Sequence, residues 1–292
     1  MSTDPQAAPA STHATAERVD AVVVGAGFSG LYVLYRLRQL GLATVVVEAG
    51  DGVGGTWYWN RYPGARVDVV STTYSYSFDD ELQQEWSWTE RYATQGEILR
   101  YIDHVADRFD LRRDIRIGTR VVSIVLDEET GEWNVSTDRG DLIESRFCVM
   151  ATGCLSAPRV PDIPGLDRFE GEWFHTGMWP HRVIDFSGRR VGIVGTGSSA
   201  IQAIPQLARQ ASQLTVFQRT PNFSIPAWNA PQDRDFERHV KENYPAFRER
   251  ARRSPIGDTN EASQVSALDV TPEEREATFE RRWREGGFSF LI

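Results

Sequence analysis

The chain of 292 residues has little of what stabilises secreted or membrane proteins. Its only two cysteines, Cys148 and Cys154, cannot form the disulfide framework that is typical of small secreted domains. No apolar run approaches the roughly 18 residues that a membrane-spanning helix requires. Residues 1–17 contain no apolar segment of the kind found in signal peptides, and we interpret them as a disordered leader. We therefore expect a cytoplasmic protein without a membrane partner.

Basic charge is also sparse. Lys241 is the only lysine among 32 Lys and Arg residues, which stand against 41 Asp and Glu, and the net charge is -9. Because no basic run is longer than two residues, we expect no nucleic-acid partner. We assign no metal-binding residues. The length and the 40% of hydrophobic residues are ordinary for a globular protein of about two domains.

The first motif is a glycine-rich turn that follows an apolar run, Val19–Val24, and opens a segment with regularly spaced leucines. A second apolar run, residues 44–47, ends next to Glu48. This is the strand–turn–helix–strand context of a dinucleotide fingerprint, in which a pyrophosphate meets a helix N-terminus and an acidic side chain binds ribose hydroxyls. The predicted nucleotide contacts are Gly25, Gly27, Ser29, Gly30 and Glu48.

A second glycine-rich turn follows the apolar run Val191–Val194. The position where NAD-binding proteins carry an acidic residue holds Arg219, followed by Thr220. A carboxylate would repel the 2′-phosphate of NADPH, whereas a guanidinium and a hydroxyl would bind it. An exposed charge at a strand end is the alternative for Arg219. The predicted NADPH contacts are Gly195, Thr196, Gly197, Ser198, Ser199, Ala200, Gln202, Arg219 and Thr220.

The predicted fold is α/β, with two Rossmann-like dinucleotide-binding domains of the three-layer β-β-α type. We predict an FAD-binding domain over 18–156, a connector over 157–190 and an NADPH-binding domain over 191–292. Downstream of Gly195 the sequence predicts two strands and then, after Pro221, helices; one of these begins at a capping box formed by Thr271 and Glu274. A doubly wound half needs at least three strands, so we expect the second domain to be incomplete.

Two further motifs carry a family resemblance. Residues 54–68 fit the pattern G-G-x-W-x-x-x-x-Y-P-G-x-x-x-D. The connector fits F-x-G-x-x-x-H-x-x-x-W-P through Phe169, Gly171, His175 and Trp179. Together with the two glycine turns, these motifs make residues 19–292 resemble the Baeyer–Villiger monooxygenases, which insert oxygen beside a ketone carbonyl.

The resemblance implies that NADPH reduces FAD, that O2 then forms a peroxyflavin, and that a ketone becomes an ester or lactone. It implies that Gly55, Thr56, Trp57 and Tyr74 contact FAD and that Arg66 contacts NADPH. Asp68 would approach both cofactors and bind an arginine that stabilises the peroxide. The resemblance also places that arginine beyond Ile292, so we expect this chain to be the N-terminal part of a longer enzyme.

Several alternatives stay open. His175 is interpreted as part of a hinge that couples domain motion to NADPH binding, with direct acid–base catalysis as the other possibility. The aromatic residues between 57 and 92 could enclose a flavin, although a core role is favoured for most of them. An enzyme that oxidises nitrogen or sulfur is a second function, and an inactive truncated chain is a third. A disulfide reductase is excluded, because it needs two cysteines in a C-x-x-C motif.

Overall fold

A computed structural model describes residues 16–155, 157–254, 257–259 and 263–290. The chain forms two compact units, each built from two separate segments. The first unit comprises Met1–Trp59 and Ile102–Pro158, and the second comprises Asn60–Tyr101 and Arg159–Ile292. The predicted leader lies almost wholly outside the described residues, and the domain boundaries derived from the sequence remain a prediction.

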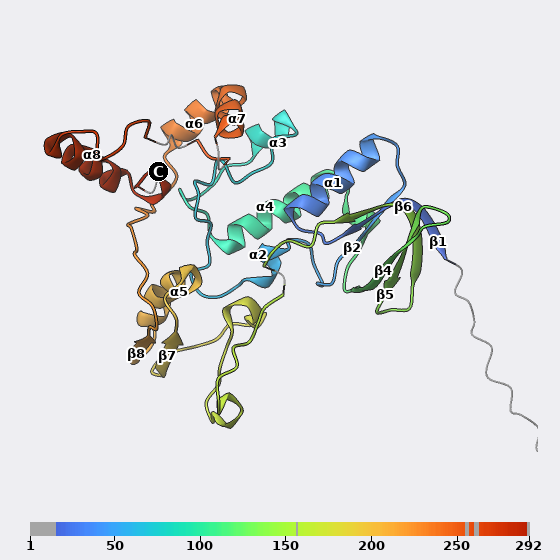
Figure 1. Ribbon diagram of the computed structural model, residues 1–292, viewed down its shortest axis with the longest axis horizontal. Helices are drawn as coiled ribbons and strands as arrows, with labels where there is room; N and C mark the ends of the chain where they lie inside the picture. Colours follow the sequence, from blue (N-terminus) through green and yellow to red (C-terminus); the bar gives the residue numbers. More distant parts are fainter. Residues whose placement is uncertain (1–15, 156, 255–256, 260–262, 291–292) are drawn as a thin grey trace, which may run out of the picture. The chain divides into compact units, whose positions relative to one another are not determined.

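The first unit is built on a mixed sheet of six described strands in the order β3-β2-β1-β6-β5-β4 (Figure 1). The strands β3, β2, β1 and β6 are parallel, and β5 and β4 continue the sheet antiparallel to them. From one edge to the other the strands are Ile115–Arg116, Thr44–Val47, Glu17–Val24, Leu142–Met150, Glu132–Thr137 and Val121–Asp127. The predicted α/β class is confirmed.

Strand β1 is the centre of this unit. It pairs with β2 on one side and with β6 on the other, and its residues Ala21, Val22 and Val23 are fully buried. Helix α1 (Phe28–Gln39) packs on β1 and β2 and buries Leu31 and Leu34. The other elements of this part of the chain are α2 (Thr56–Trp59), η1 (Arg112–Asp114) and the end of α4 (Gln95–Arg108), the helix in which the two units meet in the sequence.

The second unit contains a two-stranded parallel sheet, β7 (Arg190–Val194) with β8 (Gln213–Phe217), connected by α5 (Ser198–Ala208). Buried Ala203 and Leu207 of α5 pack with Phe186 in a small core. Helix α5 continues through Pro205. Among the described residues this sheet has no third strand, in agreement with the expected incomplete second domain.

The rest of the second unit is helical only in part. The described elements are α3 (Asp80–Glu85), α6 (Arg234–Glu242), α7 (Tyr244–Arg253), α8 (Pro272–Glu285), η2 (Leu166–Arg168), η3 (Thr176–Met178) and η4 (Gly287–Phe290). The capping box at Thr271 and Glu274 is present as predicted. Helices follow Pro221 as predicted, but the first of them, α6, begins only at Arg234, and residues 221–233 contain no helix. Three prolines in this stretch each lack the backbone N–H that a helix requires.

Of the ten aromatic residues between 57 and 92, three (Trp57, Trp88 and Tyr92) are buried and the other seven are partly buried. Trp88 and Tyr92 are 3% and 4% exposed, and the ring centroid of Tyr101 lies 5.2 Å from that of Trp88. The core interpretation is therefore supported for these rings. No helix in the described part of the chain has both the length and the apolar character needed to cross a membrane.

Candidate functional site

The first glycine turn (Gly25–Gly30) is a tight junction between β1 and α1. A Cβ atom on Gly30 would lie 1.8 Å from the carbonyl oxygen of Gly25, so no larger residue fits without moving the turn. Gly55 lies against this turn as well, because a Cβ on Gly27 would be 3.4 Å from its Cα. The four predicted contacts in the turn (Gly25, Gly27, Ser29 and Gly30) therefore lie close to a fifth, Gly55, in the first unit. Thr56 and Trp57, which were also predicted to contact FAD, follow Gly55 directly on α2.

Glu48 is held at the base of the first turn. Glu48 is 5% exposed. Its carboxylate accepts hydrogen bonds from the backbone N–H groups of Ala26 and Gly50, both at 2.7 Å. The sequence predicted a ribose-binding carboxylate and did not reveal these two bonds. They fix the orientation of the carboxylate and leave each oxygen a further lone pair, so the predicted contact with ribose is compatible with them.

The second glycine turn (Gly195–Ala200) has the same backbone conformation as the first. Its first glycine has φ +100° and that of the first turn has φ +104°. The N-cap glycines, Gly27 and Gly197, are both extended, with φ -81° and -73°. In each turn the backbone N–H of the residue four positions after the N-cap glycine donates to that glycine's carbonyl at 3.0 Å. The two predicted fingerprints thus form equivalent local structures.

Both helices that follow these turns begin without a side-chain cap. The N-termini of α1 and α5 have no side-chain hydrogen bond and no acidic residue in the first turn. In contrast, α3, α6 and α8 are capped by the side chains of Asp79, Asp233 and Thr271. Helix α7 also lacks a side-chain cap, but it follows Asn243 and not a glycine turn. An uncapped helix start keeps its backbone N–H groups available to an anion. The two turns therefore fit the pyrophosphate groups of two dinucleotides.

The segment that contains Asp68 lies on helix α5 within the second unit. The Tyr62 hydroxyl donates to Gln202 Oε1 at 2.8 Å, and Gln202 Nε2 donates to Asp68 Oδ1 at 2.9 Å. Asp68 is exposed as a residue, but partial burial of its carboxyl group raises its pKa, and the hydrogen bond from Gln202 lowers it in part. The predicted catalytic carboxylate and the helix of the second glycine turn are thus parts of one hydrogen-bonded assembly.

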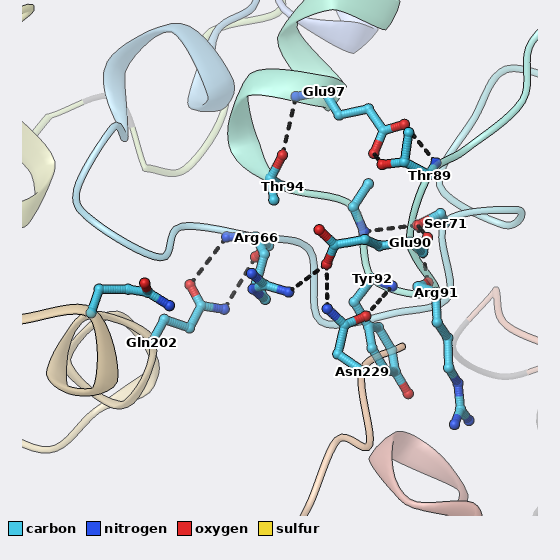
Figure 2. A network of polar contacts seen from close by, with 12 residues as sticks. Arg66, Ser71, Thr89, Glu90, Arg91, Tyr92, Thr94, Glu97, Gln202 and Asn229 are labelled. Atoms are coloured by element: carbon cyan, nitrogen blue, oxygen red, sulfur yellow. Dashed lines mark hydrogen bonds and ion pairs between the residues drawn. The ribbon is translucent and has the colours of Figure 1, made fainter. Parts of the chain in front are cut away.

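Arg66 is the centre of a second group of polar contacts (Figure 2). Its guanidinium Nη1 donates to Glu90 Oε2 at 3.0 Å, and the Asn229 side-chain amide donates to the same carboxylate. The Asn229 Oδ1 atom in turn accepts the backbone N–H of Tyr92 at 3.0 Å. Sequence reasoning missed Glu90 and Asn229, because neither belongs to a recognisable motif.

Arg219 and Thr220, which follow β8, are both exposed. The neighbouring Gln218 side chain donates to Thr196 Oγ1 at 2.9 Å, and Asn222 Nδ2 donates to the Thr196 carbonyl, also at 2.9 Å. These bonds connect the end of β8 to the second glycine turn. They place Arg219 next in sequence to a residue that contacts the turn, with its own side chain open to solvent.

The connector residues have distinct environments. The His175 Nδ1 atom accepts the backbone N–H of Gly177 at 3.2 Å, so His175 caps the short helix η3. Trp179 packs with Phe174 and Phe186, at ring-centroid distances of 5.4 and 6.1 Å. Phe169 is exposed and its ring lies next to Gly171. Trp179 therefore anchors the connector in the core of the second unit, and the hinge role of His175 stays a prediction.

Two of the predicted FAD contacts, Asp68 and Tyr74, belong to the second unit. The partly buried Arg248 of α7 fixes the segment around Tyr74, since its guanidinium donates to the Thr73 carbonyl at 3.2 Å and to Ser75 Oγ at 2.7 Å. Burial lowers the pKa of Arg248. No motif in the sequence indicates this role of Arg248. Tyr62, by contrast, could have been selected, because it occupies a fixed position of the pattern over residues 54–68.

Among the described residues no cluster of His, Cys, Asp and Glu side chains could hold a metal ion. Cys148 and Cys154 are both free, and burial raises the pKa of the Cys148 thiol. A thiol with a raised pKa is a poor nucleophile.

The comparisons with known proteins agree with the geometry. The family model of pyridine nucleotide-disulphide oxidoreductases matches residues 22–281, and the chain belongs to this family. Within it, the chain is similar to the N-terminal part of the Baeyer–Villiger monooxygenases, as its motifs predict. The disulphide in the family description has no counterpart in the two cysteines of this chain.

Three relatives illustrate the similarity. A Baeyer–Villiger monooxygenase of Pseudooceanicola batsensis is 46% identical, with 94% of this chain and 50% of that protein covered. A phenazine N-monooxygenase of Lysobacter antibioticus is 43% identical, with 94% and 51% covered. The solved structure of an oxidized steroid monooxygenase bound to NADP is 56% identical, with a TM-score of 0.90 and with 94% and 52% covered. The chain spans about half the length of the curated relatives it matches.

Proposed function

We propose that this chain supplies the FAD and NADPH sites of a monooxygenase that inserts one oxygen atom of O2 into a ketone. The observation that carries the proposal is the assembly in the second unit, where the segment Tyr62–Asp68 lies on the helix of the second glycine turn. The predicted catalytic carboxylate is thereby attached to the element that would bind NADPH.

Each part of the site has a physical role in this proposal. The uncapped starts of α1 and α5 bind the two pyrophosphates, and Glu48 binds the ribose of FAD. Arg219 binds the 2′-phosphate of NADPH, because a bidentate guanidinium suits a phosphate group. FAD held there would supply the redox chemistry, with NADPH as the reductant and O2 as the oxidant, and Asp68 would orient a cationic group at the reaction centre.

Cofactor titration of the purified chain tests the proposal. We expect a yellow protein that retains FAD and that binds NADP+ more tightly than NAD+. The variant Gly197→Ala should lose NADP+ affinity while keeping its stability, because no described atom lies within 4 Å of the added Cβ. Retention of neither cofactor would overturn the proposal.

A second candidate is oxidation of nitrogen or sulfur. It is favoured by the phenazine N-monooxygenase relative, which is nearly as similar as the Baeyer–Villiger enzyme. Parallel product analysis with a ketone, a thioether and an aromatic N-heterocycle separates the candidates. Ester formation supports the first, and N-oxide formation without ester supports the second. A chain that binds both cofactors but converts none of the three would support the inactive alternative.

A further inference from the structure

Gln202 is the residue through which helix α5 contacts the segment Tyr62–Asp68. Its side-chain amide makes four hydrogen bonds, two through each polar atom. The Oε1 atom accepts from the Tyr62 hydroxyl at 2.8 Å and from the Arg66 N–H at 3.3 Å. The Nε2 atom donates to the Arg66 carbonyl at 3.1 Å and to Asp68 Oδ1 at 2.9 Å. Figure 2 shows the amide pointing at the backbone of Arg66.

These partners leave the amide no free position. A primary amide has two N–H donors and an oxygen with two lone pairs, and each is used within the chain. The orientation of the amide is also settled, because a backbone N–H can only donate and a backbone carbonyl can only accept. Arg66 supplies both groups, so Gln202 must present an N–H, and not its oxygen, to Asp68.

The backbone of the segment is built for this contact. Gly64 has φ +85°, and a Cβ atom at this position would lie 2.2 Å from the Gln202 carbonyl oxygen. Only glycine permits both this conformation and this approach. The contact between the segment and the helix is therefore made twice, by the main chain at Gly64 and by the Gln202 amide at Arg66 and Asp68.

We propose that Gln202 is a positioning residue, which holds the segment Tyr62–Asp68 on α5 and aims the Asp68 carboxylate, and that it does not bind NADPH through its amide. This inference rests on the proposed function only where it takes Asp68 as the carboxylate of the reaction centre. It reassigns a residue that the sequence placed among the NADPH contacts.

The proposal has an electrostatic consequence that can be measured without cofactors. An N–H directed at a carboxylate favours the ionised form and so lowers its pKa. In the described part of the chain, the groups that face Asp68 are the Gln202 amide from α5 and the Tyr62 phenol from its own segment. Loss of the Gln202 donor should therefore raise the pKa of Asp68.

The test is an NMR titration of the full chain labelled with 13C at the aspartate carboxyl groups. The variant Asp68→Asn assigns the signal. We expect the pKa of Asp68 to be higher in Gln202→Met than in the unsubstituted chain, and highest in Gln202→Glu, which places a carboxylate beside it. Gln206, one turn later on α5, accepts from Arg209 at 3.1 Å, and the matched variants Gln206→Met and Gln206→Glu should leave the titration unchanged.

Two outcomes would overturn the proposal. One is an unchanged Asp68 titration in both Gln202 variants. If their affinity for NADP+ also falls while that of the Gln206 variants does not, Gln202 binds NADPH directly. The other is loss of the native circular dichroism in both Gln202 variants, which would show a purely structural residue. Because the titration needs no cofactor, failure of the unsubstituted chain to bind NADP+ would count against the proposed function alone.

Discussion

The two glycine turns have the same backbone conformation but very different surroundings. In the first unit, a Cβ atom on Gly25 would lie 2.6 Å from the Ala151 carbonyl, and β1 is paired on both sides. In the second unit, no described atom lies within 4 Å of a Cβ on Gly195 or Gly197, and β7 has one described partner, β8. Val22 of β1 is fully buried, whereas Val194 of β7 is 74% exposed.

This difference shows which properties of a turn depend on its own residues and which depend on the sheet around it. Glycines and an uncapped helix start are enough to form the turn in both units. Close packing around the turn needs strands on both sides, and only the first unit has them among the described residues. We expect the second turn to tolerate substitutions better and to open more easily, because few buried contacts restrain it.

The largest expected effect comes from the third small position of each turn. Gly30→Ala should destabilise the first unit by about 3 kcal/mol or more, since its Cβ would overlap the Gly25 carbonyl. The second turn already holds Ala200 at this position, so Ala200→Gly should cost only about 1 kcal/mol of helix stability. Urea unfolding followed by circular dichroism measures both. Equal effects would contradict the claimed difference between the turns.

The next effect concerns Glu48, which directly follows β2, and Arg219, which lies two residues after the end of β8. Glu48→Ala leaves the buried N–H groups of Ala26 and Gly50 without their acceptor, and we expect a loss of about 2–4 kcal/mol. The matched variant Arg219→Ala removes an exposed side chain and should change stability by no more than about 0.5 kcal/mol. The variant Glu48→Gln keeps one acceptor oxygen and should be intermediate. The same unfolding measurement ranks the three variants.

These contrasts mark what the sequence could predict. Both turns, their strands and Glu48 follow from residues within about thirty positions of one another, because a strand–turn–helix unit is stabilised mainly by local contacts and spacing. The contact of Gln202 with Arg66 joins residues 136 positions apart, and the contact of Glu90 with Asn229 joins residues 139 apart. No periodicity encodes such pairs. The motif around Asp68 predicts a functional segment, but only the structure shows which helix that segment contacts.

A smaller effect should appear in cofactor preference. Arg219→Ala should reduce the affinity for NADP+ by about tenfold, equivalent to about 1.4 kcal/mol, and leave the affinity for NAD+ nearly unchanged. The reason is that the guanidinium would contact only the 2′-phosphate. Isothermal titration with the two nucleotides measures the ratio. A parallel loss of both affinities would show that Arg219 supports the turn itself and does not select the phosphate.

The smallest effect compares one carboxylate from each unit. Burial raises the pKa of Asp68, so the folded chain holds this proton more tightly than the unfolded chain does. Stability from this group is therefore present below the unfolded pKa and is lost as pH rises through the folded pKa. Asp127 is the opposite case, because backbone N–H groups of Glu129 and Thr130 lower its pKa. Its contribution is present above the unfolded pKa and is lost as pH falls through the folded pKa.

Replacement by asparagine should therefore act with opposite sign at the two positions. At neutral pH, Asp68→Asn should stabilise the chain slightly, since the neutral amide removes an unfavourable charge and its oxygen can still accept from Gln202. Asp127→Asn should destabilise it slightly at the same pH, because a charge-assisted acceptor for two backbone groups is lost. Both differences should shrink as pH falls below the range in which the two carboxylates titrate, which thermal unfolding at a series of pH values measures. If the two variants shift stability in the same direction at neutral pH, then burial is not the main influence on the pKa of Asp68. Hydrogen bonds would then stabilise the charged form of Asp68, as they do for Asp127 in the first unit.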